Sequence, residues 1–241
     1  MPPMKPSKLE VDEPLRAGEV LAAAFREYGR RPVTYMSIGV VEALASLASY
    51  EGVGIHPAAG YAIAALSFLA CFTATVCVAS GWSFADARAR IRNAFVALAG
   101  LAFVVGLPQT LGRFDAVVIL IVILWLAVTA FAIPIVLYEQ HPERPVRIPG
   151  MFTALRRSMT LSQVAYLHAA LAVAILLAVS FLVTIVLVNA LNNFGDQGQL
   201  AALLISRAVL VPVVFIGLFV LYLEQQQRQR ASGDVTVGER T

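Results

Sequence analysis

AVVILIVILWLAVTAF, residues 116–131, decides the fold class, because it is apolar on every face and contains no charged side chain. A helix that is hydrophobic all round lies in a protein core or in lipid, whereas the strands of a membrane barrel alternate in polarity over about ten residues. In lipid, a helix pairs its own backbone N–H and C=O groups. The stretch therefore predicts a membrane-spanning helix rather than a barrel strand.

The composition of the whole chain agrees with a membrane protein. The chain has 241 residues, of which 59% are hydrophobic and 14% are charged, whereas soluble domains have about 45–50% and about 25%. This composition excludes a disordered chain, and the presence of only two cysteines excludes a disulfide scaffold. The formal net charge of +3 fits a membrane with anionic lipid better than a nucleic acid, so we expect no nucleic-acid partner.

Six stretches are long and apolar enough to cross a bilayer as helices, which requires about 20 residues each. They cover residues 33–50, 60–82, 91–108, 116–138, 164–190 and 200–223. The sequence therefore predicts an all-α, polytopic fold. Its three parts are an N-terminal segment over residues 1–31, a transmembrane domain with six transmembrane helices over 32–224, and a polar tail over 225–241.

Basic residues are distributed unevenly between the two sides of this predicted bundle. Of the 18 Lys and Arg residues, 16 fall before the odd-numbered spans or after the last one, while only Arg113 falls on the opposite side. Such an asymmetry sets the orientation of a membrane protein, with the basic side in the cytoplasm. We therefore expect a multi-pass protein of the bacterial plasma (inner) membrane with both termini in the cytoplasm.

Two segments on the cytoplasmic side have the pattern of interfacial amphipathic helices. In the first, apolar residues recur from Val20 to Tyr28, and Glu27 is predicted to lie on the opposite, polar face. In the second, Met151, Phe152, Leu155 and Met159 form the predicted apolar face. The first helix is interpreted as an anchor for the first span, and a specific lipid sensor is the alternative.

The arginines of these segments are expected to face anionic headgroups, where each contributes about 1 kcal/mol. Ser83 and Asp86 form an S-x-x-D capping box that predicts a further helix starting near Phe84, which carries two more such arginines. Topology anchoring is their simpler interpretation, and a dedicated phosphate site is the alternative. The predicted lipid-facing residues are Arg26, Arg30, Arg31, Arg88, Arg92, Arg156 and Arg157.

Two charged residues fall inside predicted spans, Glu42 in the first and Arg207 in the last. Charges are costly in lipid and usually pair or line a pathway. Both residues are predicted about 12 Å below the outer surface, counting about 1.5 Å per helical residue. We therefore predict an ion pair between them, either as a static link that closes the bundle or as a gate or substrate contact. Pro134 and Pro212, inside the fourth and sixth spans, are predicted to kink their helices.

Three short segments are similar to a family of bacterial six-span membrane proteins. They are LRAGEVLAAAFREYGRRP at residues 15–32, PIVLYE at 134–139 and ALRRS at 154–158. The family includes the membrane domain fused to some bacterial glycerophosphodiester phosphodiesterases, and stand-alone relatives of unassigned activity. The resemblance implies a six-helix membrane domain in a bacterial plasma membrane. It carries over no catalytic role, because the phosphodiesterase active site belongs to a separate soluble domain.

The sequence contains no motif for phosphate-loop, serine-hydrolase or zinc-protease chemistry. The predicted topology separates His56, His141 and His168, and Cys71 and Cys77 have the pattern of small buried hydrophobes. We therefore expect no enzyme activity, no cofactor and no metal.

The first hypothesis is a scaffold or accessory component of the bacterial envelope. The second is a small solute transporter or channel, and the third is a membrane-embedded lipid-modifying enzyme. The expected partners are a bilayer with anionic headgroups at the cytoplasmic face and either a membrane-protein partner or a second copy of the chain, as a homo-oligomer.

Overall fold

The fold is taken from a computed structural model that describes residues 15–106, 116–139 and 148–238. Residues 1–14 of the N-terminal segment, 107–108 of the third predicted span, Arg113, His141 and residues 239–241 of the tail lie outside this range. The helices are α1 (Ala17–Arg30), α2 (Pro32–Ile55), α3 (Pro57–Ala79), α4 (Phe84–Gly106), α5 (Ala116–Thr129), α6 (Ala132–Tyr138), α7 (Ile148–Gln163), α8 (Tyr166–Leu191) and α9 (Gly195–Gly238). The predicted all-α class is confirmed for the described residues.

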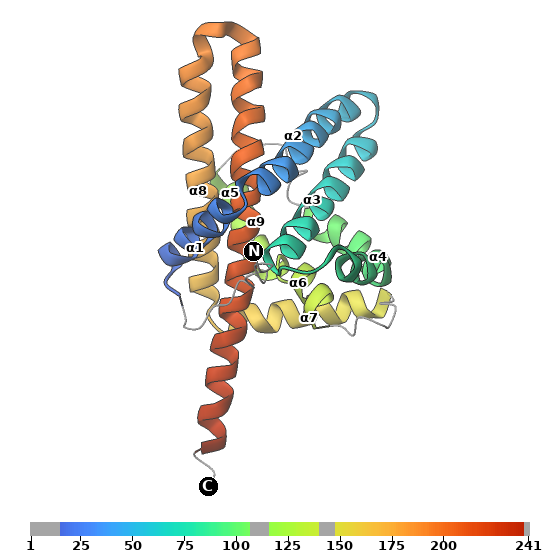
Figure 1. The fold of residues 1–241 in the computed structure, drawn as a ribbon, viewed down its shortest axis with the longest axis vertical. Coiled ribbons are helices and arrows are strands. Elements are labelled where there is room, and N and C mark those ends of the chain that lie inside the picture. The colour runs from blue at the N-terminus through green and yellow to red at the C-terminus, as the bar shows by residue number, and fades with distance from the viewer. Residues whose placement is uncertain (1–14, 107–115, 140–147, 239–241) are drawn as a thin grey trace, which may run out of the picture.

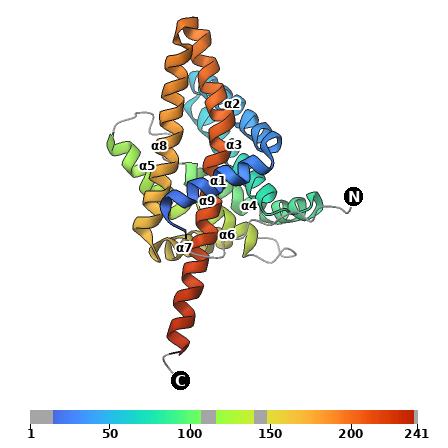
Figure 2. The same cartoon turned by 60° about the vertical axis from the view of Figure 1, so that its left-hand side comes forward.

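Two helical hairpins dominate the structure (Figure 1). Helices α8 and α9 run antiparallel and are joined by a 3₁₀ turn over Asn192–Phe194. Helices α2 and α3 form a second hairpin, and the two hairpins diverge toward their turns. We call the end with both turns the hairpin end. Helix α7 lies across the half of the molecule opposite the hairpin turns, and we call this half the α7 end. The last part of α9 extends beyond α7. Figure 2 shows α5 beside α8.

Four stretches of the described residues are long and apolar enough to cross a membrane: Pro32–Ser49, Ala58–Ala79, Val118–Tyr138 and Tyr166–Ala231. The last stretch includes most of both α8 and α9, so the arrangement fits a helical membrane protein. The predicted span 91–108 falls largely in α4, which is not among these stretches and runs roughly perpendicular to α9 in Figure 2. The count of six spans therefore stays a prediction.

Local chemistry accounts for two helix boundaries. The backbone N–H of Asp86 donates to Ser83 Oγ at 3.2 Å, which confirms the predicted cap at the start of α4. The predicted span 116–138 is divided into α5 and α6 by a turn at Ala130 and Phe131. Pro134 has no N–H to donate to the carbonyl of Ala130, four residues earlier, and its ring crowds that carbonyl, so the helix is interrupted there.

Helix α1 buries a stripe that includes a carboxylate. Ala17, Val20, Ala24 and Glu27 are buried on the face that packs on α8 and α9, whereas Phe25 is exposed. The prediction that Glu27 lies on the polar face is therefore wrong. The reason is its position seven residues after Val20, almost two full turns, which returns it to the buried side.

Helix α7 packs on the protein through one face and leaves two of its large apolar side chains exposed. Ala154, Ser158 and Leu161 are buried, while Phe152 and Met159 are 62% and 47% exposed. The hydroxyl of Ser158 donates to the carbonyl of Val128 in α5, so this face buries a satisfied polar group. Exposure at these two positions is compatible with the predicted apolar face of an interfacial helix, which lies against lipid, so that face stays a prediction.

The centre of the structure is packed by aromatic rings and by close helix contacts. Phe215 of α9 lies between Phe68 and Phe72 of α3, with ring centroids 5.1 and 5.2 Å apart. On the other side of α9, a Cβ on Gly217 would lie 2.6 Å from a methyl carbon of Leu176 in α8. Helix α9 is therefore the central helix, held between α8 on one side and the α2–α3 hairpin on the other.

Candidate functional site

The two charges predicted to lie inside membrane spans, Glu42 of α2 and Arg207 of α9, face each other in the structure. Arg207 Nη1 lies 3.4 Å from Glu42 Oε1, and the same nitrogen donates to Ser46 Oγ. Ser46 in turn donates to Glu42 Oε1 at 2.9 Å, which closes a three-residue network. The Glu42 side chain is 12% exposed and that of Arg207 is 48% exposed. The carboxylate is thus enclosed, while much of the guanidinium faces outward.

The network lies next to a direct contact between the backbones of α2 and α9. A Cβ on Gly39 would overlap the carbonyl oxygen of Ala208 and lie 2.6 Å from its carbonyl carbon. Helix α9 continues through Pro212, which has no N–H to offer that carbonyl. The Ala208 carbonyl therefore lacks its usual helical N–H donor, and it is the group against which Gly39 packs.

A second polar site, the Glu224 cluster, lies toward the C-terminal end of α9. Glu224 is fully buried and pairs with Arg228 one turn later. Gln225 Nε2 donates to Glu224 Oε2 at 2.9 Å, and His168 Nε2 of α8 lies 3.6 Å from Glu224 Oε1. Arg228 Nη2 also donates to the carbonyl of Leu15 at 3.0 Å. The cluster therefore ties α8, α9 and the start of α1 together.

A further cluster forms around Glu139, the residue after α6, and includes Tyr222 and Gln226 of α9. We call it the Glu139 cluster. Gln226 Nε2 donates to Glu139 Oε1 at 2.8 Å and to the Tyr222 hydroxyl at 2.6 Å, while Tyr222 itself lies 3.4 Å from the same carboxylate oxygen. Arg157 Nε of α7 is 3.4 Å from Glu139 Oε2. This carboxylate thus links α7, the end of α6 and α9.

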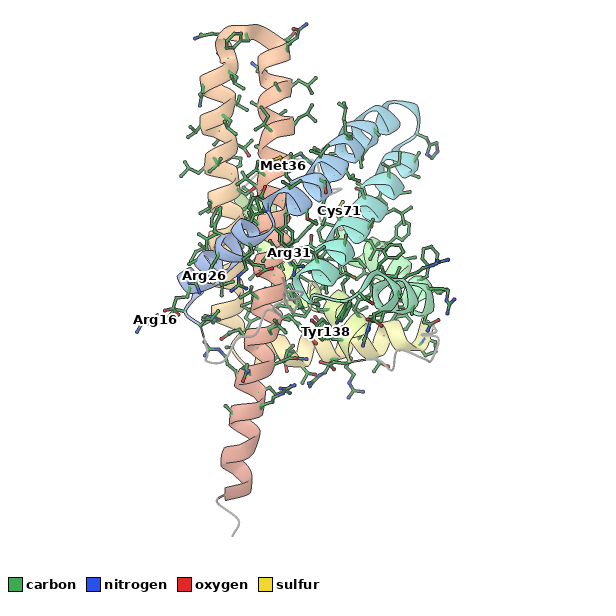
Figure 3. The ribbon with its side chains drawn as sticks, viewed as in Figure 1. Arg16, Arg26, Arg31, Met36, Cys71 and Tyr138 are labelled. Atoms are coloured by element: carbon green, nitrogen blue, oxygen red, sulfur yellow. The ribbon has the colours of Figure 1, made fainter. Side chains whose placement is uncertain are left out.

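A fourth carboxylate, Glu27, joins α1 to α2. Its Oε1 accepts from the Tyr35 hydroxyl at 3.1 Å, and its Oε2 pairs with Arg30 Nη1 at 2.9 Å. Tyr28 stacks on Tyr35 with ring centroids 5.9 Å apart, and burial raises the pKa of the Tyr28 phenol. Figure 3 marks the neighbouring Arg31 where α1 meets α2.

The seven predicted lipid-facing arginines occupy two kinds of environment. Arg31 donates to the carbonyl of Val78 in α3 at 2.9 Å, and Arg157 pairs with Glu139, so both are half-buried and tied to the protein. The other five are exposed, although Arg30 also pairs with Glu27. They are Arg26, Arg30, Arg88, Arg92 and Arg156.

Arg90, which was not among those seven, is held by the protein. Its guanidinium carbon lies 4.5 Å from the centroid of the Trp82 ring, and Nη1 donates to the carbonyl of Leu137 at 2.7 Å. Trp82 packs on Tyr138, which is labelled in Figure 3. The Tyr138 hydroxyl donates to Ser80 Oγ at 2.5 Å. This stacked arrangement connects α4 to α3 and α6.

Sequence reasoning missed these buried clusters because their partners come from different helices. The spacing of Glu224 and Arg228, four residues apart, was the available signal for one pair. Cys71 and Cys77 are buried and unpaired by a disulfide. Among residues 15–106, 116–139 and 148–238, no group of three His, Cys, Asp or Glu side chains is placed to hold a metal ion. In the described part of the chain, the polar clusters are linked chiefly to other parts of the fold.

Comparisons with protein-family models, curated proteins and solved structures find no match for this chain. The resemblance to the membrane domain of some glycerophosphodiester phosphodiesterases therefore stays a prediction.

Proposed function

We propose that the chain is an integral protein of the bacterial plasma membrane that acts as a scaffold or accessory component of the envelope, not as an enzyme. The observation that carries the proposal is the pairing of Arg207 with Glu42. Ionisable side chains in a membrane mark pathways when they line a cavity, and here they join the first and last long helices of the described fold. The Glu224 and Glu139 clusters support it, since their charges also connect helices.

The distribution of arginine supports an orientation with the α7 end in the cytoplasm. Apart from Arg207, all the described arginines lie on α1 or at its N-cap, between α1 and α2, on α4 and α7, or in the last part of α9. The exposed arginines in this set suit contact with anionic headgroups of the inner leaflet. The partners that we propose are therefore this lipid surface and either a membrane protein or a second copy of the chain.

The alternative function is a small solute transporter or channel. It is favoured by the 48% exposure of the Arg207 side chain and by the break between α5 and α6 at Ala130 and Phe131. Discontinuous helices that carry charges are typical of transporter sites. A membrane-embedded lipid-modifying enzyme is a weaker alternative, for which His168 beside Glu224 is the nearest approach to an acid–base pair.

Reconstitution separates these functions. The purified full chain is placed in vesicles loaded with a panel of ions and small metabolites, and solute release is compared with that from protein-free vesicles. The scaffold proposal expects equal release, and partner crosslinking in native membranes is expected to give one adduct of fixed stoichiometry. Release that requires the protein and is lost in Glu42→Gln would overturn the proposal in favour of transport. Turnover of vesicle lipids that is lost in His168→Ala would favour the enzyme.

A further inference from the structure

Arg207 has hydrogen-bonding capacity that its contacts within the described residues leave unused. A guanidinium has five N–H donors. Both contacts of Arg207 with described residues, to Glu42 and to Ser46, use Nη1. Within residues 15–106, 116–139 and 148–238, no hydrogen bond engages Nε or Nη2. This edge carries three N–H groups and belongs to a side chain that is 48% exposed.

The Arg207 guanidinium extends from the point where α2 and α9 cross toward the hairpin end. The residue next to Arg207, Ala208, lies against Gly39 of α2, whereas the guanidinium contacts Ser46. Ser46 is seven residues further along α2, about 10 Å toward its turn. Arg207 therefore extends out of the apolar crossing and into the region where the two hairpins diverge.

Two exposed apolar side chains lie on the same face of α9 as Arg207. Leu200 and Leu203, at helical spacing from Arg207 and nearer the turn of α9, are each 43% exposed. Hydrocarbon cannot accept hydrogen bonds from a guanidinium, and leaving such donors unpaired in lipid is costly. The first turn of α9, starting at Gly195, is polar, so the guanidinium lies within about two to three helical turns of polar groups.

We infer that the Nε–Nη2 edge of Arg207 binds a phosphate group at the hairpin end of the membrane domain. Two N–H groups in one plane match two phosphate oxygens, which is the geometry in which arginine binds phosphate bidentately. Glu42 acts as a positioning residue, because it holds Nη1 and turns the other edge outward. The phosphate source is either a phospholipid headgroup or a soluble phosphate, and the inference does not depend on the scaffold function.

The inference makes predictions of opposite sign for the two charges. Arg207→Gln removes the donors, and Arg207→Lys retains the charge but not the planar edge, so both are expected to weaken phosphate binding. Glu42→Gln removes a negative charge close to the anion while keeping an oxygen that can accept from Arg207. It is therefore expected to strengthen binding. Arg88→Gln, which removes an exposed arginine of α4, is the matched control.

The test uses the full chain in maltoside detergent and native mass spectrometry. The probes are dioleoyl-phosphatidylglycerol, dioleoylglycerol as the phosphate-free analogue, and inorganic phosphate as a competitor. The wild type is expected to retain the phospholipid about tenfold more than the diglyceride. Arg207→Gln and Arg207→Lys are expected to lose this preference, Glu42→Gln to increase it, and Arg88→Gln to leave it unchanged. Competition by inorganic phosphate identifies a soluble ligand, whereas a lack of competition identifies the lipid.

The inference is overturned if Arg207→Lys and Arg207→Gln retain the preference. It is also overturned if Arg88→Gln loses as much of the preference as they do, or if Glu42→Gln weakens binding while keeping the wild-type unfolding temperature. Because Arg207→Gln leaves Glu42 unpaired, the double variant Glu42→Gln/Arg207→Gln is measured alongside. It removes both charges together and is expected to lose the phosphate preference while keeping the helical circular dichroism spectrum.

Discussion

Gly39 and Ala208 bring the backbones of α2 and α9 into direct contact, because a Cβ on Gly39 would overlap the Ala208 carbonyl. The pair of Glu42 and Arg207 lies immediately beside this crossing. Pro212 leaves the same carbonyl without its usual helical donor. The crossing thus depends on Gly39 of α2, which has no side chain, and on the Ala208 carbonyl of α9, which has no helical N–H partner.

Gly39→Ala is expected to destabilise the protein. In a helix, alanine is favoured over glycine by about 0.5–1 kcal/mol, but overpacking against a backbone carbonyl costs about 1–3 kcal/mol. The unfolding temperature in detergent should therefore fall. Gly18→Ala on α1 is the control, because a Cβ there meets nothing within 4 Å and should leave the unfolding temperature equal or higher. Equal effects of the two substitutions would show that α2 and α9 do not touch at this point.

Glu42 and Arg207 are expected to be energetically coupled. Each single substitution to glutamine leaves the other charge without its partner, whereas the double substitution removes both. In a double-mutant cycle followed by thermal unfolding, the double variant should be more stable than the sum of the single effects predicts, by about 1 kcal/mol. Additive effects would mean that the two side chains do not interact.

Glu224 should matter more for stability than Glu139. The Glu224 carboxylate is fully buried, whereas its partner Arg228 is 29% exposed, so removing the carboxylate is expected to cost about 3 kcal/mol, the lower end of the range for buried pairs. Glu139 and Arg157 are both partly exposed, and pairs of that kind contribute about 0–1 kcal/mol. Denaturant unfolding of Glu224→Ala is therefore expected to give a larger loss than that of Glu139→Gln. The reverse order would contradict the burial described for the Glu224 cluster.

The proposed orientation can be measured with single cysteines. Gln197→Cys lies near the turn of the α8–α9 hairpin and Arg230→Cys lies near the end of α9, and both positions are exposed. A membrane-impermeant maleimide should label the first in intact cells and the second only after permeabilisation. The natural Cys71 and Cys77 are buried and provide a low background. Labelling of both engineered positions from the same side would exclude the proposed topology.

The long apolar helices could be predicted from the sequence because hydropathy is a local property. Pro134 likewise carries its own chemistry, and the turn that separates α5 from α6 lies at Ala130 and Phe131, where the missing N–H places it. The equal depth expected for Glu42 and Arg207 was enough to anticipate that they approach each other. The hydroxyl of Ser46, which contacts both, had no sequence signal.

The buried clusters could not be predicted, because each depends on how helices distant in the sequence pack. In the sequence, Glu27 resembles an ordinary residue of a polar helix face, and its burial follows only from the packing of α1 on α8 and α9. Glu224 likewise resembles an exposed residue of a polar tail, and only the packing of α8 brings His168 beside it. In α7, hydropathy placed Phe152 and Met159 on one apolar face, but it did not show that Ala154 and Ser158 make the contact with the rest of the fold. Patterns identify which residues are apolar, whereas helix packing also selects for size.

Helix α9 is one uninterrupted element of 44 residues. At about 1.5 Å per residue it is about 66 Å long, roughly twice the hydrocarbon thickness of a bilayer. A rod of this length fixes the spacing between its two ends, so raising or lowering the turn after Asn192 by a few ångströms must translate the opposite end by a similar amount. The length of α9 therefore sets how far its last helical turns extend beyond the bilayer surface at the α7 end, once the turn after Asn192 is fixed at the opposite surface.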